Sequence, residues 1–302
     1  MLLSFYDILK ARKIMNQQPH NQFVAVNLGC GSHYRKGWLN FDLYPASKDV
    51  KQANIIQGIP LDDGAADFVY HSHVLEHLTR EDGERFLQEC YRILKPSGTL
   101  RIVVPDLEDA AREYLRNIAR CDAGESAAID DLEWSHIELY DQIAREDRDG
   151  EFGKYLHREN VPNKEYVIQR MGGLVERAFR IIEGDRKAGG GQNGQSFTKK
   201  LHRLFASDFY RNRILRFVLG SRDWKNLQVG RARNAGEVHK WMYDRVTLGY
   251  LLKKTGFSQI SVQSSAESGW SYWSVQNMDQ DEKRMAVHAN SLYIEAVKHI
   301  FN

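Results

Sequence analysis

Short apolar runs alternate with helical patterns along residues 23–104, and this alternation limits the possible folds more than any other feature of the chain. Apolar runs typical of strands occupy residues 23–28, 38–42, 50–53, 67–71 and 99–104. Apolar residues at helical spacing predict a helix over 80–94, which we expect to end before a turn at Lys95-Pro96-Ser97-Gly98. Strands that alternate with helices are typical of parallel sheets, so the segment predicts an α/β core.

From Leu107 to about Gly236 the strand pattern disappears and helical periodicity dominates, as in residues 107–119 and 166–182. A glycine-rich stretch, 184–196, is expected to form a loop. Charge is segregated here. Residues 106–151 hold 15 acidic and 5 basic residues, a net charge of −10. Residues 196–233 hold 10 basic and 2 acidic residues, a net charge of +8. One interpretation is that these two segments face each other or solvent. The other is that the basic segment contacts an anionic substrate, a membrane surface or nucleic acid.

The α/β pattern resumes after residue 236. A helix is expected at 244–255, a strand at 260–263, and either a strand or a helix at 291–297. We therefore divide the chain into an N-terminal helical extension (1–22), a core (23–106), a helical insertion or lid over the acceptor site (107–236) and a C-terminal completion of the core sheet (237–302).

Composition excludes several classes of protein. Of the 302 residues, 42% are hydrophobic and 27% are charged, as in ordinary globular proteins. No run approaches the roughly 18 apolar residues of a membrane span, so no transmembrane segment is predicted. The first residues lack the basic start of a signal peptide. Three widely separated cysteines suggest reduced thiols and no disulfide framework or zinc ribbon, so we expect a cytoplasmic protein.

A glycine turn follows the first strand, in Val26-Asn27-Leu28-Gly29-Cys30-Gly31, and Asp42 stands eleven residues after Gly31. Glycines directly after a buried strand let the backbone turn sharply and approach a ligand closely. Asp42 ends the second strand, where a carboxylate can accept both hydroxyls of a ribose. The pattern predicts a nucleoside-bearing cofactor at the carboxyl ends of parallel strands.

The nature of this cofactor follows from what the motif lacks. The dinucleotide fingerprint requires a third small residue at the position where this chain has Tyr34. It also requires an acidic residue about 20 residues after the glycines, whereas Asp42 follows Gly31 by only eleven residues. A pyrophosphate is therefore poorly accommodated. S-adenosylmethionine carries no phosphate and tolerates a looser turn, so it is the cofactor that we expect.

Further motifs extend this pattern over about half the chain. They lie at residues 27–31, 37–42, 58–61, 67–78, 94–98, 101–106, 237–244, 251–257 and 291–296. In these segments the chain resembles class I S-adenosylmethionine-dependent methyltransferases, and among them the bacterial enzymes often encoded with polysaccharide-biosynthesis genes. The resemblance implies a Rossmann-like sheet of seven strands, the last one antiparallel.

The resemblance also implies a set of cofactor-binding residues. These are Asn27, Gly29, Cys30, Gly31, Asp42, Leu43, Asn54, His71, Ser72 and His73. In such enzymes the glycine turn lines the methionine, the acid holds the ribose and the next residue covers the adenine. Asn54 aligns where an Asp usually binds the adenine amine, and the segment from His71 to His73 is expected beside the methionine and the sulfonium.

A second interpretation applies to His73-Val74-Leu75-Glu76-His77, which matches the H-x-x-E-H pattern of inverted zinc proteases. The two histidines would share one helix face, but the sequence identifies no third ligand. We therefore predict no metal site and a structural role for Glu76 and His77 in the strand–helix turn. A zinc-dependent hydrolase that uses His73 and His77 is kept as an alternative.

Methyl transfer to a hydroxyl needs a base, and His73, Asp106 and His239 are the candidates. Two of these residues have a structural alternative to catalysis. Asp106 could cap the helix that begins at Leu107, and His239 could stabilise the point where the chain returns from the insertion to the core. Tyr243 is a further candidate for contact with the acceptor.

We expect methylation of an oxygen on a sugar, a glycan or another small polar metabolite, and the family resemblance favours the sugar. The acceptor could be anionic, and the basic segment 196–233 could contact a membrane peripherally; no DNA is expected as a partner. The alternatives are a nucleic-acid or protein methyltransferase, the hydrolase and a cofactor-binding scaffold without activity.

Overall fold

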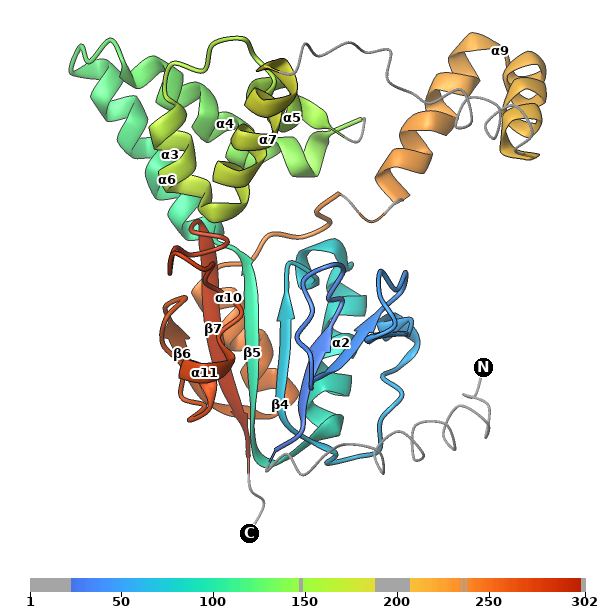
Figure 1. The fold of residues 1–302 in the computed structure, drawn as a ribbon, viewed down its shortest axis with the longest axis vertical. Coiled ribbons are helices and arrows are strands. Elements are labelled where there is room, and N and C mark those ends of the chain that lie inside the picture. Colours follow the sequence, from blue (N-terminus) through green and yellow to red (C-terminus); the bar gives the residue numbers. More distant parts are fainter. Residues whose placement is uncertain (1–22, 147–148, 188–206, 235, 237, 300–302) are drawn as a thin grey trace.

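A computed structural model describes residues 23–146, 149–187, 207–234, 236 and 238–299 (Figure 1). Its strands are β1 Ala25–Leu28, β2 Leu39–Asp42, β3 Val50–Gln52, β4 Ala66–Ser72, β5 Leu94–Pro105, β6 Phe257–Gln263 and β7 Ser291–Lys298. They form one sheet in the order β3-β2-β1-β4-β5-β7-β6. Strands β1 to β5 pair in parallel, and β7 is antiparallel to both of its neighbours. The predicted seven-stranded sheet with an antiparallel last strand is confirmed, and 291–297 is a strand.

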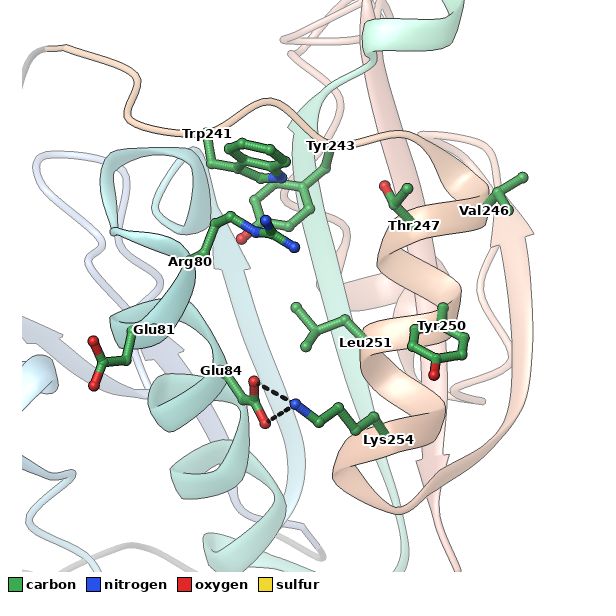
Figure 2. A pocket seen from close by; sticks show the side chains of 10 residues that line it. All are labelled: Arg80, Glu81, Glu84, Trp241, Tyr243, Val246, Thr247, Tyr250, Leu251 and Lys254. Atoms are coloured by element: carbon green, nitrogen blue, oxygen red, sulfur yellow. Dashed lines mark hydrogen bonds and ion pairs between the residues drawn. The ribbon is translucent and has the colours of Figure 1, made fainter.

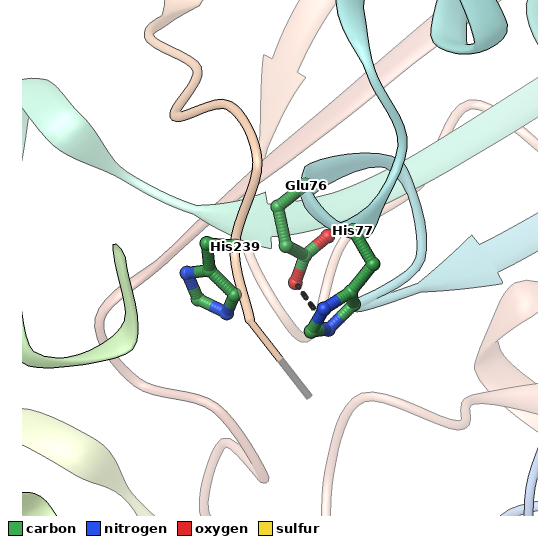
Figure 3. A group of neighbouring side chains, drawn as sticks. All are labelled: Glu76, His77 and His239. Atoms are coloured by element: carbon green, nitrogen blue, oxygen red, sulfur yellow. Dashed lines mark ion pairs between the residues drawn. The ribbon is translucent and has the colours of Figure 1, made fainter. Parts of the chain in front are cut away.

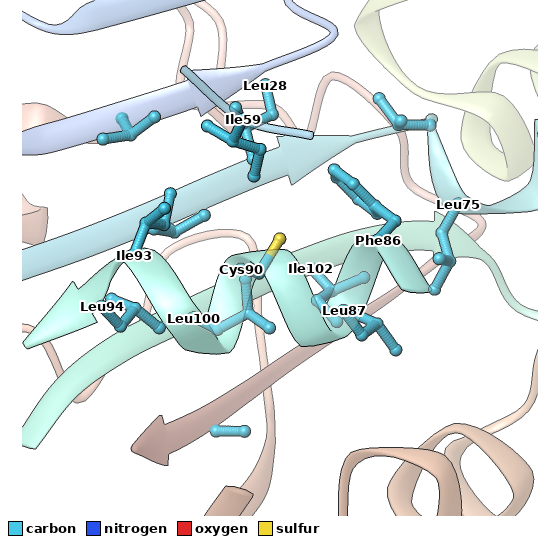
Figure 4. Packing of buried hydrophobic residues seen from close by; sticks show 14 of the residues in the cluster. Leu28, Ile59, Leu75, Phe86, Leu87, Cys90, Ile93, Leu94, Leu100 and Ile102 are labelled. Atoms are coloured by element: carbon cyan, nitrogen blue, oxygen red, sulfur yellow. The ribbon is translucent and has the colours of Figure 1, made fainter. Parts of the chain in front are cut away.

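Two helices cover one face of the sheet. Helix α2 (Arg80–Ile93) and helix α10 (Arg245–Thr255) bury their apolar sides against the strands. Figure 4 shows Phe86 and Cys90 of α2 packed on this face. Helix α2 ends at Ile93, before Lys95–Gly98 as predicted, and although β5 begins at Leu94, its pairing with β4 shifts between Leu94 and Thr99, where Ser97 has φ 65°.

The opposite face is covered by residues 264–290, which include the short helix α11 (Trp273–Gln276). Aromatic side chains fill this layer, and Trp270 stacks on Phe68 with ring centroids 4.1 Å apart. Arg101 of β5 is fully buried here and forms ion pairs with Asp279 at 2.7 Å and Glu295 at 2.8 Å. This network attaches the covering segment to the sheet.

The described part of the insertion consists of helices joined by short turns and loops. They are α3 Leu107–Asp122, α4 Ala128–Ala144, α5 Gly150–Leu156, α6 Lys164–Met171, α7 Gly173–Lys187 and α9 Ser207–Asn234, which is broken at Gly220. The helices α3 to α7 lie beyond the carboxyl end of β5 (Figure 1) and have their own core around the buried Trp134. The predicted helical insertion is confirmed, whereas its role as a lid stays a prediction.

The helical periodicity predicted over 166–182 is confirmed, and it is divided between two helices, α6 and α7, by a break at Gly172. Gly172 has φ 85°, and a Cβ there would collide with the carbonyl oxygen of Ala286. A close approach of backbone to backbone therefore requires glycine at this point.

The opposite charges in the insertion are only partly matched to each other. Acidic residues of 106–151 pair with nearby arginines, as Asp131 does with Arg120 at 2.8 Å, and Lys225 of α9 lies 3.8 Å from Glu146. No helix in the described ranges is long and apolar enough to cross a membrane. The predicted extension 1–22 and most of the glycine-rich segment 184–196 lie outside the described residues.

Candidate active site

The glycine turn after β1 has the conformation that the sequence predicts. Gly29 and Gly31 have φ values of 64° and 51°, in the left-handed region that favours glycine. The backbone N–H groups of Gly29 and Cys30 both donate to the carbonyl of Phe41 in β2, at 2.8 and 3.2 Å. A Cβ on Gly29 would lie 2.5 Å from Val74, whereas one on Gly31 would meet nothing within 4 Å. The turn is therefore fixed by β2 and packed against Val74 at Gly29, whereas a ligand can approach it at Gly31.

Asp42 joins the end of β2 to this turn. Its Oδ2 accepts a hydrogen bond from the Gly31 N–H at 2.7 Å, and its Oδ1 accepts one from the Tyr44 N–H at 2.8 Å. The carboxylate is half-buried, and each of its oxygens has a further lone pair for a ribose hydroxyl. Leu43, which we expect to cover the adenine, is 43% exposed next to it. These positions agree with the predicted roles but do not test them.

Three other predicted cofactor residues have structural roles. The Asn27 side chain is buried under the turn and donates to the carbonyl of His33 at 3.1 Å, so it does not reach a ligand above the turn. Cys30 is also buried, and this burial raises the pKa of its thiol to about 12. The side-chain carbonyl of Asn54 accepts from the Ile56 N–H at 3.2 Å and thereby caps the short helix η1 (Ile55–Gln57).

His71, which we expect beside the methionine, has its side chain in the apolar layer between β4 and α2. Its ring is fully buried and packs against Phe86 of α2, with ring centroids 5.0 Å apart. Burial lowers the pKa of His71 to about 3, and neither ring nitrogen has a hydrogen-bond partner. Side chains alternate along a strand, so Ser72 points away from this layer and remains half-buried at the end of β4.

His73 follows β4 with φ 54°, a conformation that is rare for a residue other than glycine and that occurs mainly at functional sites. Its Nδ1 lies 3.0 Å from Oε1 of Glu76, and its Nε2 lies 3.1 Å from the hydroxyl of Ser291. The ring stacks on His288, with centroids 3.8 Å apart. Burial lowers the pKa of His73 to about 4, yet a quarter of the side chain is exposed. His73 thus connects the end of β4 with the start of β7.

Glu76 and His77 lie in the short helix η2 (Leu75–His77), and the third member of their cluster is His239 (Figure 3). The backbone N–H groups of Lys240 and Trp241 donate to the carbonyl of Glu76 at 2.7 and 3.2 Å, which brings the chain returning from the insertion against η2. The donor atoms of the three side chains lie within 4.8 Å of one another. The sequence alone did not connect His239 with the H-x-x-E-H motif.

Burial determines the charge in this cluster. Glu76 is fully buried, which raises its carboxyl pKa to about 7, and His239 is 5% exposed, which lowers its pKa to about 2. The hydroxyl of Tyr243 is buried nearby without a hydrogen-bond partner. Burial, and after it the charge of Glu76, raises the pKa of Tyr243 to about 12.

Asp106 caps helix α3, as the alternative interpretation expected. Its Oδ1 accepts from the N–H groups of Glu108 and Asp109, at 2.9 and 3.3 Å. Its backbone N–H donates to the carbonyl of Asn290 at 3.1 Å. The carboxylate thus belongs to the helix start, where it stabilises the first turn.

A pocket of about 590 Å³ lies between α2 and α10 (Figure 2). It is lined by Arg80, Glu81, Glu84, Trp241, Tyr243, Val246, Thr247, Tyr250, Leu251 and Lys254. The guanidinium of Arg80 lies 4.5 Å from the centre of the Trp241 ring, and Lys254 pairs with Glu84 at 2.7 Å. Because Trp241 is bonded to the Glu76 backbone, the pocket adjoins the cluster of Glu76, His77 and His239.

Comparison with known proteins agrees with the geometry of the core. Residues 26–102 match a family described as "Methyltransferase domain", which is about a quarter of the chain. Over 58 residues the chain is 41% identical to a "Probable S-adenosylmethionine-dependent methyltransferase" of Mycobacterium tuberculosis and 34% identical to one of Mycolicibacterium smegmatis. These stretches cover 19% of this chain, which spans only about a fifth of the length of either relative (20% and 21%).

The solved structures that match are more distant in sequence. A SAM-dependent methyltransferase from Thermotoga maritima is 14% identical, with 98% of this chain and 89% of that chain covered and a TM-score of 0.37. One from Archaeoglobus fulgidus is 13% identical, with 96% and 92% covered and the same TM-score. Residues 26–102 are thus similar to a methyltransferase domain, and the relatives that match within the chain are described as S-adenosylmethionine-dependent, so the comparisons support S-adenosylmethionine as the cofactor.

Proposed function

We propose that this chain is an S-adenosylmethionine-dependent methyltransferase. The observation that carries the proposal is the hydrogen bond between Asp42 and Gly31 at the carboxyl edge of the sheet. It places a carboxylate for the ribose beside an open backbone turn for the amino-acid end of the cofactor. The strand order β3-β2-β1-β4-β5-β7-β6 puts both groups at the point where the order reverses, between β1 and β4.

The acceptor in this proposal is a small polar molecule, and the family resemblance favours a sugar or a glycan. The pocket of Figure 2 supports this choice, because it combines the aromatic side chains of Trp241 and Tyr250 with the charged Arg80 and Lys254. Aromatic faces suit the apolar side of a sugar ring, and charged groups suit its hydroxyls. Its volume also lies in the usual range for small-molecule sites, about 300–1,000 Å³.

In the reaction, a lone pair of the acceptor oxygen forms the new bond to the methyl carbon, and the carbon–sulfur bond breaks with its electron pair going to sulfur. The hydroxyl proton must leave the acceptor oxygen, and we assign it to His73. His73 is partly exposed at the end of β4, whereas Asp106 caps α3 and His239 is almost completely buried. The acceptor must lie about 3–3.5 Å from the methyl carbon.

The test of this function is calorimetric titration of the full chain with S-adenosylmethionine and with S-adenosylhomocysteine. Wild type is expected to bind both, and Asp42→Ala is expected to weaken binding by at least about tenfold, since one lost hydrogen bond to a charged group costs roughly 1.5–3 kcal/mol. Asp49→Ala, which removes an exposed acid from the loop before β3, is the matched control. No binding to wild type, or equal affinity of Asp42→Ala, contradicts the proposal.

Transfer itself is tested with labelled methyl donor and nucleotide sugars, lipid-linked sugars, RNA and protein from the host. Label in a sugar is the expected result. Label in RNA or protein instead identifies the other class of acceptor, and cofactor binding without transfer to any of them indicates a scaffold without activity.

Helix α9 is the proposed contact with an anionic membrane surface that carries the acceptor. Phe217 and Val218 are 90% and 71% exposed, the exposed Arg216 precedes them, and the exposed Arg222 lies just after the break at Gly220. Exposed apolar side chains beside cations suit an anionic bilayer. Sedimentation with anionic vesicles, lost with neutral vesicles or with Phe217→Ser, tests the contact; equal binding to both vesicle types contradicts it.

A further inference from the structure

We propose that Glu76, His77 and His239 bind one divalent transition-metal ion. These residues come from two separate segments, η2 after β4 and the chain that returns from the helical insertion (Figure 3). Their donor atoms lie within 4.8 Å of one another. Ligands on one ion, at bond lengths of about 2.0–2.2 Å, stand roughly 3–4 Å apart, so small side-chain rotations complete the site.

The hydrogen bonding of His77 leaves the correct nitrogen for a metal. Its Nδ1 lies 3.3 Å from the carbonyl oxygen of Val238, which can only accept, so Nδ1 carries the proton. Its Nε2 therefore presents a lone pair and lies 4.0 Å from Oε1 of Glu76. A backbone carbonyl that fixes the tautomer in this way is the usual partner of a metal-binding histidine.

Glu76 is the second and independent observation. Its side chain is fully buried, and neither carboxylate oxygen has a hydrogen bond of good geometry. A buried carboxylate with so few partners is costly, and a cation between Glu76 and the imidazoles of His77 and His239 would reduce this cost. The nearest group is Nδ1 of His73 at 3.0 Å, and His73 is itself held by Ser291. His73, the base of the proposed function, thus also positions Glu76.

The ligand set indicates the class of metal. Two imidazoles and one carboxylate suit Zn²⁺, Mn²⁺, Fe²⁺ or Co²⁺, whereas Mg²⁺ and Ca²⁺ prefer sites made of oxygens alone. Three protein ligands leave a position open for a further oxygen ligand. If the proposed function holds, that ligand is the acceptor hydroxyl, and the ion would both orient it and lower its pKa.

Metal binding is tested on the full chain after treatment with a chelator, by equilibrium dialysis against Zn²⁺ and, separately, Mn²⁺. Wild type is expected to bind one equivalent of at least one of these ions. Glu76→Gln and His239→Gln should weaken binding by at least about 100-fold, and His73→Asn by about 10–100-fold, which is the usual cost of losing an outer partner of a ligand. His136→Gln, which changes an exposed histidine of α4, should bind as wild type does.

Titration with S-adenosylmethionine on the same samples separates the two proposals and shows that each variant is folded. Metal binding without cofactor binding leaves the metal site in place and contradicts the proposed function. Cofactor binding with no metal bound, or with equal metal affinity in wild type and Glu76→Gln, overturns the metal site. Glu76→Gln is the most informative variant for the metal site, because it keeps the shape of the side chain and removes its negative charge.

Discussion

The carboxylate of Asp42 accepts a hydrogen bond from the backbone N–H of Gly31 at 2.7 Å. This bond joins the ends of β1 and β2, so the turn and the acid form a single unit at the sheet edge. The turn is also fixed to Phe41 through the N–H groups of Gly29 and Cys30. A site built in this way is preorganised, and changes to its backbone should affect folding as well as binding.

Gly29→Ala is expected to destabilise the chain by more than Gly124→Ala. Both glycines have left-handed φ values, 64° and 84°, so both substitutions carry a backbone cost of roughly 1–2 kcal/mol. At Gly29 the new Cβ also lies 2.5 Å from Val74, whereas at Gly124 it meets nothing within 4 Å. Overpacking adds about 1–3 kcal/mol. Urea unfolding of both variants measures the difference, and equal values contradict this account.

His71→Leu is expected to stabilise the chain at pH 7 by up to about 3 kcal/mol, because it removes two buried nitrogens without partners. The pKa of His71 is lowered to about 3 in the folded chain, so the unfolded chain takes up this proton first as the pH falls below about 6.5. Wild type therefore loses stability between pH 6.5 and 3, and the variant should lose less. Melting curves of both proteins at pH 7 and pH 5 measure these stabilities. If the stability difference between His71→Leu and wild type is not larger at pH 5 than at pH 7, the predicted pH dependence is contradicted.

Arg101→Met should cost about 3–5 kcal/mol of unfolding free energy, because it leaves Asp279 and Glu295 buried without their cation. Arg85→Met, which breaks exposed pairs on α2, should cost no more than about 1 kcal/mol. Chemical denaturation of the two variants measures the contrast. A mild effect at Arg101 would show that the segment 264–290 is held by its aromatic contacts alone.

Glu89 should stabilise the chain at neutral pH and lose this effect in acid. Its hydrogen bonds from Arg92 lower the pKa of the carboxyl, and the Ile59 N–H also donates to it at 2.9 Å. For a carboxyl with a depressed folded pKa, the stabilisation is present above the unfolded value of about 4.3 and disappears as the pH falls through the folded value. Glu89→Gln should therefore be less stable than wild type at pH 7 and approach it near pH 3, as measured by urea unfolding. A constant difference over this range would contradict the assignment.

Trp241→Ala should raise KM for the acceptor and leave the dissociation constant of S-adenosylmethionine unchanged, because Trp241 lines the pocket of Figure 2 and not the glycine turn. Tyr140→Ala, which removes an exposed aromatic side chain from α4, is the control and should change neither constant. Steady-state kinetics and calorimetry measure the two constants, and weaker cofactor binding in Trp241→Ala would place the pocket on the cofactor side.

Local patterns predicted much of the core. The alternation of strands and helices predicted a parallel sheet, because periodicity reports which side of an element is buried. The same patterns did not show where distant segments meet. The pair Gly172-Gly173 is a local signal for a break between helices, but only the tertiary structure shows that the carbonyl of Ala286 lies against Gly172.

By itself, the sequence determined the α/β core, the glycine turn and the acid at the end of the second strand, because each of these is encoded within a few neighbouring residues. Only the tertiary structure decided that His71 faces the core and that His239 joins Glu76 and His77. The reason is physical: strand pairing and the return of the chain from the insertion set these contacts, and such long-range contacts leave no local periodicity to read.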